Sequence, residues 1–212
     1  MQALSGTSSL PPGMALALAA SFGSLEHWHA QLVAAARDGG TGALQLAFQD
    51  DSGMLVNERA SVSGTPLLTL DESGHDPLEA AAAVETLLAT IDWAAVYSRY
   101  QLAVTAASDR LQASAQEAQQ AAHLIDVRRA GAYAGAATTL PGARWRDPAA
   151  IGTWLQEIPV GAQVVVYCVH GHDVSRAAAL RLRAAGIKAR FLQGGLEGWA
   201  ASGHALQPKD AA

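Results

Sequence analysis

Cysteine, charge and long apolar runs are all scarce in this chain of 212 residues. A single cysteine excludes an internal disulfide and any cysteine-rich zinc site, and it is typical of a reducing compartment. Charged residues make up 16% of the chain and hydrophobic residues 50%, which excludes a disordered tail. No apolar run reaches the roughly 18 residues that cross a bilayer. We therefore expect a soluble, cytoplasmic protein with no membrane partner.

Basic residues are also missing from the first 36 positions. The short apolar stretch at 14–20 therefore lacks the positive leader of a secretory signal peptide. Residues 1–110 hold four Lys and Arg against twelve Asp and Glu (net −8), whereas residues 111–212 hold ten against seven (net +3). This asymmetry predicts two units with different partners. The acidic balance argues against nucleic acid, and the basic half suits a small anion.

The first half of the sequence predicts an α+β domain. Apolar residues recur at helical spacing until Asp38 and Gly39 end the helix. Alternating residues around a glycine-containing turn predict a β-hairpin, and strong helix formers follow Pro77. The predicted elements are a helix at 14–37, strands at 43–48 and 54–58, and helices at 78–91 and 93–100.

The second half alternates short apolar runs with helical segments, which predicts an α/β domain: a parallel sheet with helices on both faces. The predicted elements are strands at 123–127, 163–167 and 188–192, and a helix at 175–185 before Gly186. Residues 103–122 are rich in Ala, Gln and Ser and predict a surface helix between the domains. We place the domains at 1–101 and 120–212, with a helical linker at 102–119.

Cys168 follows the second of these strands and opens the loop Val169-His170-Gly171-His172-Asp173-Val174. Ligands of open α/β sheets bind at the carboxyl ends of strands, where loop N–H groups and a helix dipole favour an anion. A thiol there should be biased toward thiolate, which is the nucleophilic form. A lone cysteine is more often a small buried hydrophobe, so position is what makes Cys168 a candidate nucleophile.

Five motifs follow one another in the second half: Leu124-Ile125-Asp126-Val127-Arg128, Leu140-Pro141-Gly142-Ala143, Val165-Val166-Tyr167-Cys168, Gly171-His172 and Gly194-Gly195-Leu196-Glu197-Gly198-Trp199. In this order they resemble landmarks of the rhodanese-like sulfurtransferase domain. The match in order and spacing covers residues 120–206.

The resemblance implies a double displacement. The Cys168 thiolate would take the outer sulfur of a small anionic donor such as thiosulfate, and a thiol or cyanide-type acceptor would remove it from the persulfide. The loop N–H groups from Val169 to Val174 would bind the anionic persulfide, and loop side chains are expected at the substrate. No metal and no organic cofactor is needed.

Side chains near Cys168 allow functional and structural interpretations. Asp126 and Arg128 match an Asp-x-Arg of the family. Asp126 is expected to tie strand to loop, whereas Arg128 is a candidate for substrate binding that could equally be structural. His170 and His172 would raise the positive potential of the loop when protonated, or be bystanders. As a metal pair they lack a fourth ligand.

The loop departs from the family pattern at Asp173 and Val174, where related loops commonly carry basic or hydroxyl side chains. Thiosulfate is therefore a less secure donor. The phosphatase and arsenate-reductase relatives place Arg six residues after the nucleophile, a position that is Val174 here, and Arg176 lies two residues further on. Phosphoryl and arsenate chemistry is not expected.

The first half resembles the C-terminal domain of iron/manganese superoxide dismutases over residues 10–101. The motifs are Ala20-Ser21-Phe22-Gly23-Ser24, Gly40-Thr41-Gly42-Ala43, Thr65-Pro66-Leu67-Leu68-Thr69-Leu70-Asp71 and Ile91-Asp92-Trp93. The metal-ligand motif of the family aligns with Asp71-Glu72-Ser73-Gly74-His75, which keeps the ligand types but loses the flanking Trp and Glu.

A working site in that family also needs two histidines from a preceding helical domain. His27 and His29 cannot replace them, because two residues apart on a helix they project about 200° from each other. We expect a degenerate unit that holds no metal. With the covering domain missing, apolar surface should remain for a partner, and we hypothesise a homodimer.

Three functions follow from these resemblances. The first is sulfur transfer through a persulfide on Cys168. The alternative is a non-catalytic interaction module, or one in which Cys168 senses oxidants. The third is metal-dependent superoxide dismutation.

Overall fold

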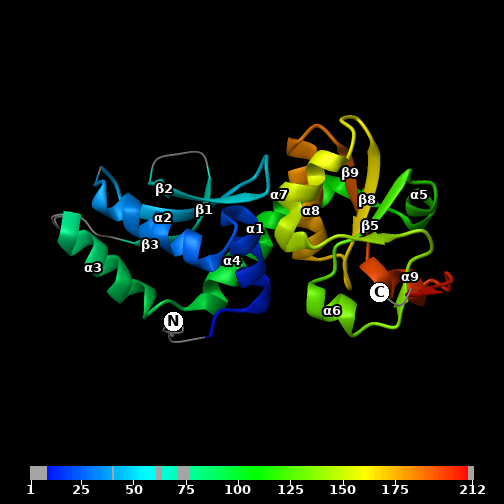
Figure 1. The fold of residues 1–212 in the computed structure, drawn as a ribbon, viewed down its shortest axis with the longest axis horizontal. Coiled ribbons are helices and arrows are strands. Elements are labelled where there is room, and N and C mark those ends of the chain that lie inside the picture. Colours follow the sequence, from blue (N-terminus) through cyan, green and yellow to red (C-terminus); the bar gives the residue numbers. More distant parts are fainter. Residues whose placement is uncertain (1–8, 40, 61–63, 71–76, 210–212) are drawn as a thin grey trace. The chain divides into compact units, whose positions relative to one another are not determined.

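The computed structural model describes residues 9–39, 41–60, 64–70 and 77–209. The chain forms two compact units, which Figure 1 draws in sequence colours. Unit 1 runs to residue 103, except for residues 51–53, and unit 2 contains residue 104 onward. Each unit has its own sheet, in line with an α+β domain followed by an α/β domain. The predicted fold class is confirmed.

Unit 1 combines helices with a three-stranded antiparallel sheet of order β2-β1-β3. Its elements are α1 (Pro12–Phe22), α2 (Leu25–Arg37), β1 (Leu44–Gln49), β2 (Met54–Arg59), β3 (Thr65–Leu70), α3 (Pro77–Leu88) and the first part of α4 (Trp93–Ser108). The predicted hairpin is present as β1 and β2, which pair from Leu44 with Arg59 to Gln49 with Met54.

Two features of unit 1 differ from the sequence prediction. The single helix expected at 14–37 is two helices, because Gly23 adopts a positive φ of 87° and Ser24 caps α2 by accepting a hydrogen bond from the His27 N–H. Strand β3 was not predicted from periodicity. It contains Pro66 and pairs with β1 across a register shift, which obscures the alternation that marks a strand.

The core of unit 1 is built on two tryptophans. Trp28 and Trp93 are fully buried, and their rings meet edge to face at 5.7 Å. The indole N–H of Trp28 donates to Asn57 on β2 at 3.1 Å, which ties α2 to the sheet. Leu18 and Leu32 are equally buried and bring α1 and α2 into the same core.

Unit 2 is built on a five-stranded parallel sheet of order β4-β9-β8-β5-β7. Its strands are β4 (Gln112–Ala113), β5 (His123–Asp126), β7 (Arg144–Trp145), β8 (Gln163–Tyr167) and β9 (Lys188–Leu192), while β6 (Thr138–Thr139) and β10 (Gln207–Pro208) form a separate antiparallel pair. Its helices are the end of α4, η1 (Asp109–Leu111), α5 (Ala115–Gln119), α6 (Ala130–Ala134), η2 (Pro148–Ala150), α7 (Ile151–Trp154), η3 (Leu155–Glu157), α8 (Asp173–Ala184) and α9 (Gly195–Ala201).

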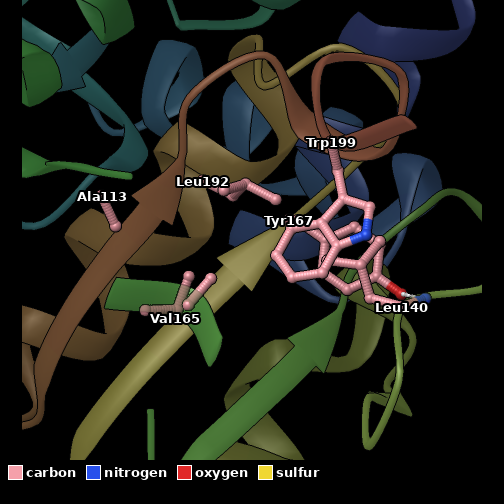
Figure 2. Packing of buried hydrophobic residues seen from close by; sticks show 7 residues of the cluster. Ala113, Leu140, Val165, Tyr167, Leu192 and Trp199 are labelled. Atoms are coloured by element: carbon pink, nitrogen blue, oxygen red, sulfur yellow. Dashed lines mark hydrogen bonds between the residues drawn. The ribbon is translucent and has the colours of Figure 1, made fainter. Parts of the chain in front are cut away.

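Helices cover both faces of this sheet (Figure 1). On the face under α5 and α9, the buried residues form a cluster that includes Ala118, Val165, Tyr167, Leu192 and Trp199 (Figure 2). Val165 and Tyr167 occupy alternate positions of β8 and share this face, so Val164 and Val166 face the other layer. Three valines in succession are buried because the sheet is covered on both sides.

Residues 102–119 are not the single helical linker that the sequence predicts. Helix α4 ends at Ser108, and after one turn of 3-10 helix the chain enters the sheet as β4, which pairs with Phe191 and Leu192 of β9. Ser114 then starts α5 with a capping box to Glu117. The reason is that Leu111 and Ala113 are buried in unit 2. Their burial outweighs the preference of the surrounding Ala, Gln and Ser residues for a surface helix.

Exposed hydrophobic surface is sparse. Leu102 and Val160 are the exposed large hydrophobic side chains among the described residues. Within those residues, no helix is long and apolar enough to cross a membrane. In the described part of unit 1, Leu102 is the exposed large hydrophobic side chain that could contribute to the expected apolar surface. The homodimer stays a prediction.

The buried leucines of unit 1 predict a stability difference between two matched variants. Leu32→Ala should lower the free energy of unfolding by about 2–5 kcal/mol, because it leaves a cavity in the core. Leu102→Ala removes the same atoms from a side chain that is 72% exposed, and it should change the free energy of unfolding by about 0.5 kcal/mol or less. Urea unfolding followed by circular dichroism measures both, and equal effects would contradict the described core.

Candidate functional site

Cys168 lies one residue beyond β8, at the carboxyl end of a central strand. The strand ends at Tyr167, and the loop of residues 168–172 leads directly into α8, which begins at Asp173. Cys168 is 6% exposed and carries a free thiol. The one cysteine of the chain therefore lies at the carboxyl edge of the parallel sheet, where ligands of such sheets bind.

The Cys168 sulfur has a hydroxyl partner. Its Sγ lies 3.2 Å from the Oγ of Ser175, which sits in the first turn of α8 and is fully buried. The same hydroxyl lies 3.3 Å from the backbone carbonyl of His172, to which it can donate. Ser175 thus links the sulfur to the loop. Ser175 was not predicted from the sequence, although a hydroxyl seven residues after the cysteine, in the first turn of the following helix, is a signal that could have identified it.

The loop is held from behind by the glycine pair that begins α9. The N–H of Leu196 donates to the carbonyl of Cys168 at 2.9 Å, and the N–H of Glu197 to that of Val169 at 3.0 Å. A Cβ on Gly195 would lie 2.5 Å from the Cys168 carbonyl oxygen and 2.6 Å from the Gly171 nitrogen. Only glycine permits this approach. The Gly-Gly motif is therefore part of the site rather than a distant landmark.

The predicted loop side chains surround Cys168 in different ways. His170 Nδ1 lies 3.0 Å from the Glu197 carboxylate in an exposed ion pair, and its ring centroid is 5.5 Å from that of His172, which is also exposed. Asp173 is the first residue of α8, where its negative charge matches the helix dipole. Val174 follows in the same turn and is half-buried.

Four of the loop's backbone donors are unused. Among the hydrogen bonds between described residues, none has the N–H of Val169, His170, Gly171 or His172 as its donor. Gly171 also has a positive φ of 71°, and a Cβ there would meet the backbone of Leu192, Gly194 and Gly195. Adjacent free N–H groups in a tight loop are the usual elements of an anion-binding concavity.

Arg176 supports the loop from the helix. Its Nε donates to the Gly171 carbonyl at 3.1 Å, its Nη1 to the Ser108 hydroxyl at 3.3 Å, and its guanidinium lies 4.3 Å from the centre of the Phe191 ring. Burial lowers the pKa of Arg176, although the charges of Asp109 and Cys168 oppose the shift. The sequence analysis noted this arginine only as misplaced for oxyanion binding. In the structure, Arg176 supports the loop, and its positive charge interacts electrostatically with Cys168.

A buried ionic network fixes the neighbouring strand. Arg128 and Asp126 are 1% and 0% exposed, and the guanidinium Nη2 lies 2.6 Å from the carboxylate, which Nε also contacts at 2.9 Å. The Tyr167 hydroxyl donates to the same carboxylate at 2.9 Å. Burial and the Asp126 charge raise the pKa of Tyr167, so its phenol stays protonated as a donor. Nη2 of Arg128 also donates to the Thr138 carbonyl at 3.1 Å.

This network bears on the role of Arg128. Nε and Nη2 of its guanidinium donate to Asp126 and Thr138, and its backbone carbonyl accepts the indole N–H of Trp145. The internal ion pair favours the structural interpretation of Arg128, and its contact with substrate stays a prediction. Burial tends to lower the pKa of Arg128, but the hydrogen bonds and charge of Asp126 outweigh it and raise that pKa.

The metal-ligand remnants expected in unit 1, Asp71 and His75, lie outside the described residues. His29 is paired with Glu85 at 3.0 Å. The described ranges hold no group of three or more His, Cys, Asp or Glu side chains that could bind a metal. We derive no step through a metal.

Comparison with known proteins identifies the two parts of the chain. Residues 109–202 match the family model of the rhodanese-like domain, so this region is a rhodanese-like domain. The N-terminal region matches the iron superoxide dismutase of Cupriavidus metallidurans, with 33% identity over 109 residues that cover 45% of this chain and 55% of that protein. The chain thus spans about half the length of this curated relative.

Solved structures with similar folds match less than the full chain. A rhodanese-related protein from Thermoplasma volcanium is 19% identical and covers 45% of this chain and 96% of its own, with a TM-score of 0.40. A probable thiosulfate sulfurtransferase is 25% identical over 46% of this chain and 48% of its own, with a TM-score of 0.40. The polysulfide-sulfur transferase of Wolinella succinogenes is 20% identical over 56% and 92%, with a TM-score of 0.41.

Two Arg–carboxylate pairs of equal length allow a test of the buried network. Asp126→Ala should destabilise unit 2 by about 3–5 kcal/mol, because it leaves the Arg128 charge buried without a partner. Glu157→Ala breaks the exposed pair with Arg146, also at 2.6 Å, and should change stability by at most about 1 kcal/mol. Denaturant unfolding measures both. A mild effect of Asp126→Ala would show that the network does not hold the strand.

Proposed function

We propose that the rhodanese-like domain at residues 109–202 transfers sulfane sulfur through a persulfide on Cys168. One observation carries the proposal: the chain's one cysteine lies at the carboxyl end of β8, in a loop with unused backbone N–H groups, with a buried hydroxyl 3.2 Å from its sulfur. This placement combines a nucleophile with the electrostatic groups that an anionic sulfur requires.

The first half-reaction loads the cysteine. The Cys168 thiolate attacks the outer sulfur of thiosulfate or of another small sulfane-containing anion. A bond forms between Sγ and that sulfur while the donor's sulfur–sulfur bond breaks, and the rest of the donor, which is sulfite in the case of thiosulfate, leaves with the electron pair. The product is a persulfide whose terminal sulfur carries the negative charge, and no external oxidant or reductant is needed.

The second half-reaction returns the enzyme to its starting state. A thiolate or cyanide acceptor attacks the terminal sulfur of the persulfide, and the sulfur–sulfur bond breaks with its electrons on Sγ. Cyanide leaves as thiocyanate, and Cys168 is again a thiolate. The loop N–H groups of residues 169–172 would hold the terminal sulfur between the two steps, because they donate to no other described residue and can bind an anionic sulfur.

The surroundings of Cys168 favour a small donor. A thiol that is 6% exposed admits the end of a small anion more readily than a bulky group. His170 and His172 are exposed on the same loop and add positive charge to it when protonated, whereas Glu197 and Asp173 oppose them. The balance of these charges sets how strongly a dianionic donor is attracted, and we therefore name the donor by size and charge.

Sulfur loading tests the proposed function directly. Incubation with thiosulfate should add the mass of one sulfur atom to the intact protein, and subsequent cyanide should remove it and release thiocyanate. Cys168→Ser should show neither change, because it lacks the nucleophile. Mass spectrometry and colorimetric thiocyanate measurement record the two steps.

The outcomes separate this function from its alternative. Absence of an adduct with thiosulfate and with other sulfane donors, under conditions where the protein is folded, would reject the enzyme. Oxidation of Cys168 by peroxide without any sulfane transfer would favour the redox-sensing module.

Ser175 is expected to act as a positioning residue for the sulfur. Ser175→Ala should lower kcat by about 2- to 10-fold, the equivalent of one hydrogen bond, and leave the KM for thiosulfate nearly unchanged. Ser202→Ala is the matched control, since its hydroxyl donates to the Gly198 carbonyl within α9. Steady-state kinetics separate the two parameters. A changed KM with constant kcat would place Ser175 in donor binding instead.

A further inference from the structure

One face of the sheet in unit 2 is covered only in part. Helix α5 has five residues and α9 has seven, and the buried cluster under them ends at Val165. Beyond it, toward the amino ends of β8 and β9, Gln163 and Lys188 are exposed. Two short helices cannot span the full length of the strands, and a groove remains.

This groove has the size of a small-molecule site. Its volume is about 430 Å³, within the range of roughly 300–1,000 Å³ usual for ligand pockets. The residues that line it include Ala121 and Val165 as apolar floor, Arg183, Lys188 and Arg190 as cations, and Glu117 as the one acid.

The register of the strands explains why the cations gather here. Gln163 pairs with Lys188 and Val165 with Arg190 in the parallel ladder. Alternate residues of a strand point to the same face, so Lys188 and Arg190 stand beside Val165 on the side that α5 leaves open. Arg183 comes from the last turn of α8 and donates to the carbonyl of Ala189, the residue between them, at 3.4 Å.

The positive charge of the groove is only partly neutralised. Arg190 forms an ion pair with Glu117 and also donates to the Gln112 carbonyl. The pKa of Glu117 is lowered by the backbone N–H of Ser114 and then by Arg190, so its charge is present at neutral pH. Among the described residues, neither Arg183 nor Lys188 has a carboxylate within 4.0 Å. Two cations are therefore left to face the groove.

We propose that this groove binds a small phosphate monoester, with the dianionic phosphate between Arg183 and Lys188 and the apolar part of the ligand on Val165 and Ala121. A tetrahedral dianion accepts hydrogen bonds from a guanidinium and an ammonium at the same time. The cations lie at the other end of the strand from Cys168, because Gln163, the partner of Lys188, and the cysteine are five positions apart along β8, about 16 Å at roughly 3.3 Å per residue. The site is also independent of sulfur transfer.

Phenyl phosphate is the probe for a test on the full chain. It should bind saturably in calorimetry, more tightly than inorganic phosphate, which lacks the apolar part, and than benzyl alcohol, which lacks the charge. Amide resonances of Ala121 and Val165 should shift during the titration, while those around Cys168 stay in place. Equal affinity for phenyl phosphate and inorganic phosphate, or shifts centred elsewhere, would overturn the proposal.

Matched variants separate a site from general charge attraction. Arg183→Gln combined with Lys188→Gln should weaken phenyl phosphate binding about tenfold or more. Arg110→Gln combined with Arg144→Gln removes the same charge from exposed positions outside the groove and should leave binding nearly unchanged. Equal losses in the two double variants would show non-specific attraction and reject the site. Circular dichroism confirms that both remain folded.

Discussion

The close approach of two backbone segments is the constraint on which the candidate site depends. The loop after β8 and the turn before α9 lie so near that a Cβ on Gly195 would come within 2.7 Å of three backbone atoms of residues 168, 169 and 171. Two backbone hydrogen bonds cross the same gap. A loop held this way cannot relax around its cysteine, so the position of Cys168 is set by the main chain before any side chain contributes.

The second support of the site lies under the neighbouring strand. A buried ion pair is weak evidence for stability, because desolvation of both charges offsets their attraction. The pair Asp126 and Arg128 is nevertheless well satisfied: the carboxylate also accepts from Tyr167, and the guanidinium donates to Thr138. Tyr167 immediately precedes Cys168. The network therefore links the end of β5 to the end of β8 and gives the strand a single position.

Much of unit 2 could be read from the sequence because its signals are local. Short apolar runs mark β5, β8 and β9, with three successive valines in β8, and Gly186 follows the helix between the last two strands with a positive φ of 80°. The loop position of Cys168 followed from the same pattern. Strand β4 could not be predicted, because a two-residue strand has no periodicity and its pairing with β9 joins residues about 80 positions apart.

The roles of individual side chains were harder to predict than the elements that carry them. Asp-x-Arg allowed both a substrate contact and an internal ion pair, and the burial of both side chains favours the ion pair. Ser175 and Gly195 act through contacts with residues that only the fold brings near. In unit 1, the break at Gly23 and the cap at Ser24 were visible in the sequence, but the helical spacing of apolar residues continues across both.

Parallel strands give the two ends of β8 different chemical character. At the carboxyl end the chain leaves in the loop of Cys168, whose N–H groups at residues 169–172 donate to no other described residue. At the amino end, backbone hydrogen bonds from Gly161 to Gly186 and from Lys188 to Ala162 join the segments that lead into β8 and β9. Ligand contacts at the amino end must therefore come from strand side chains, whose spacing the ladder fixes. Arg190 is held by Glu117 and by Gln112, so its side chain has a fixed place at the groove.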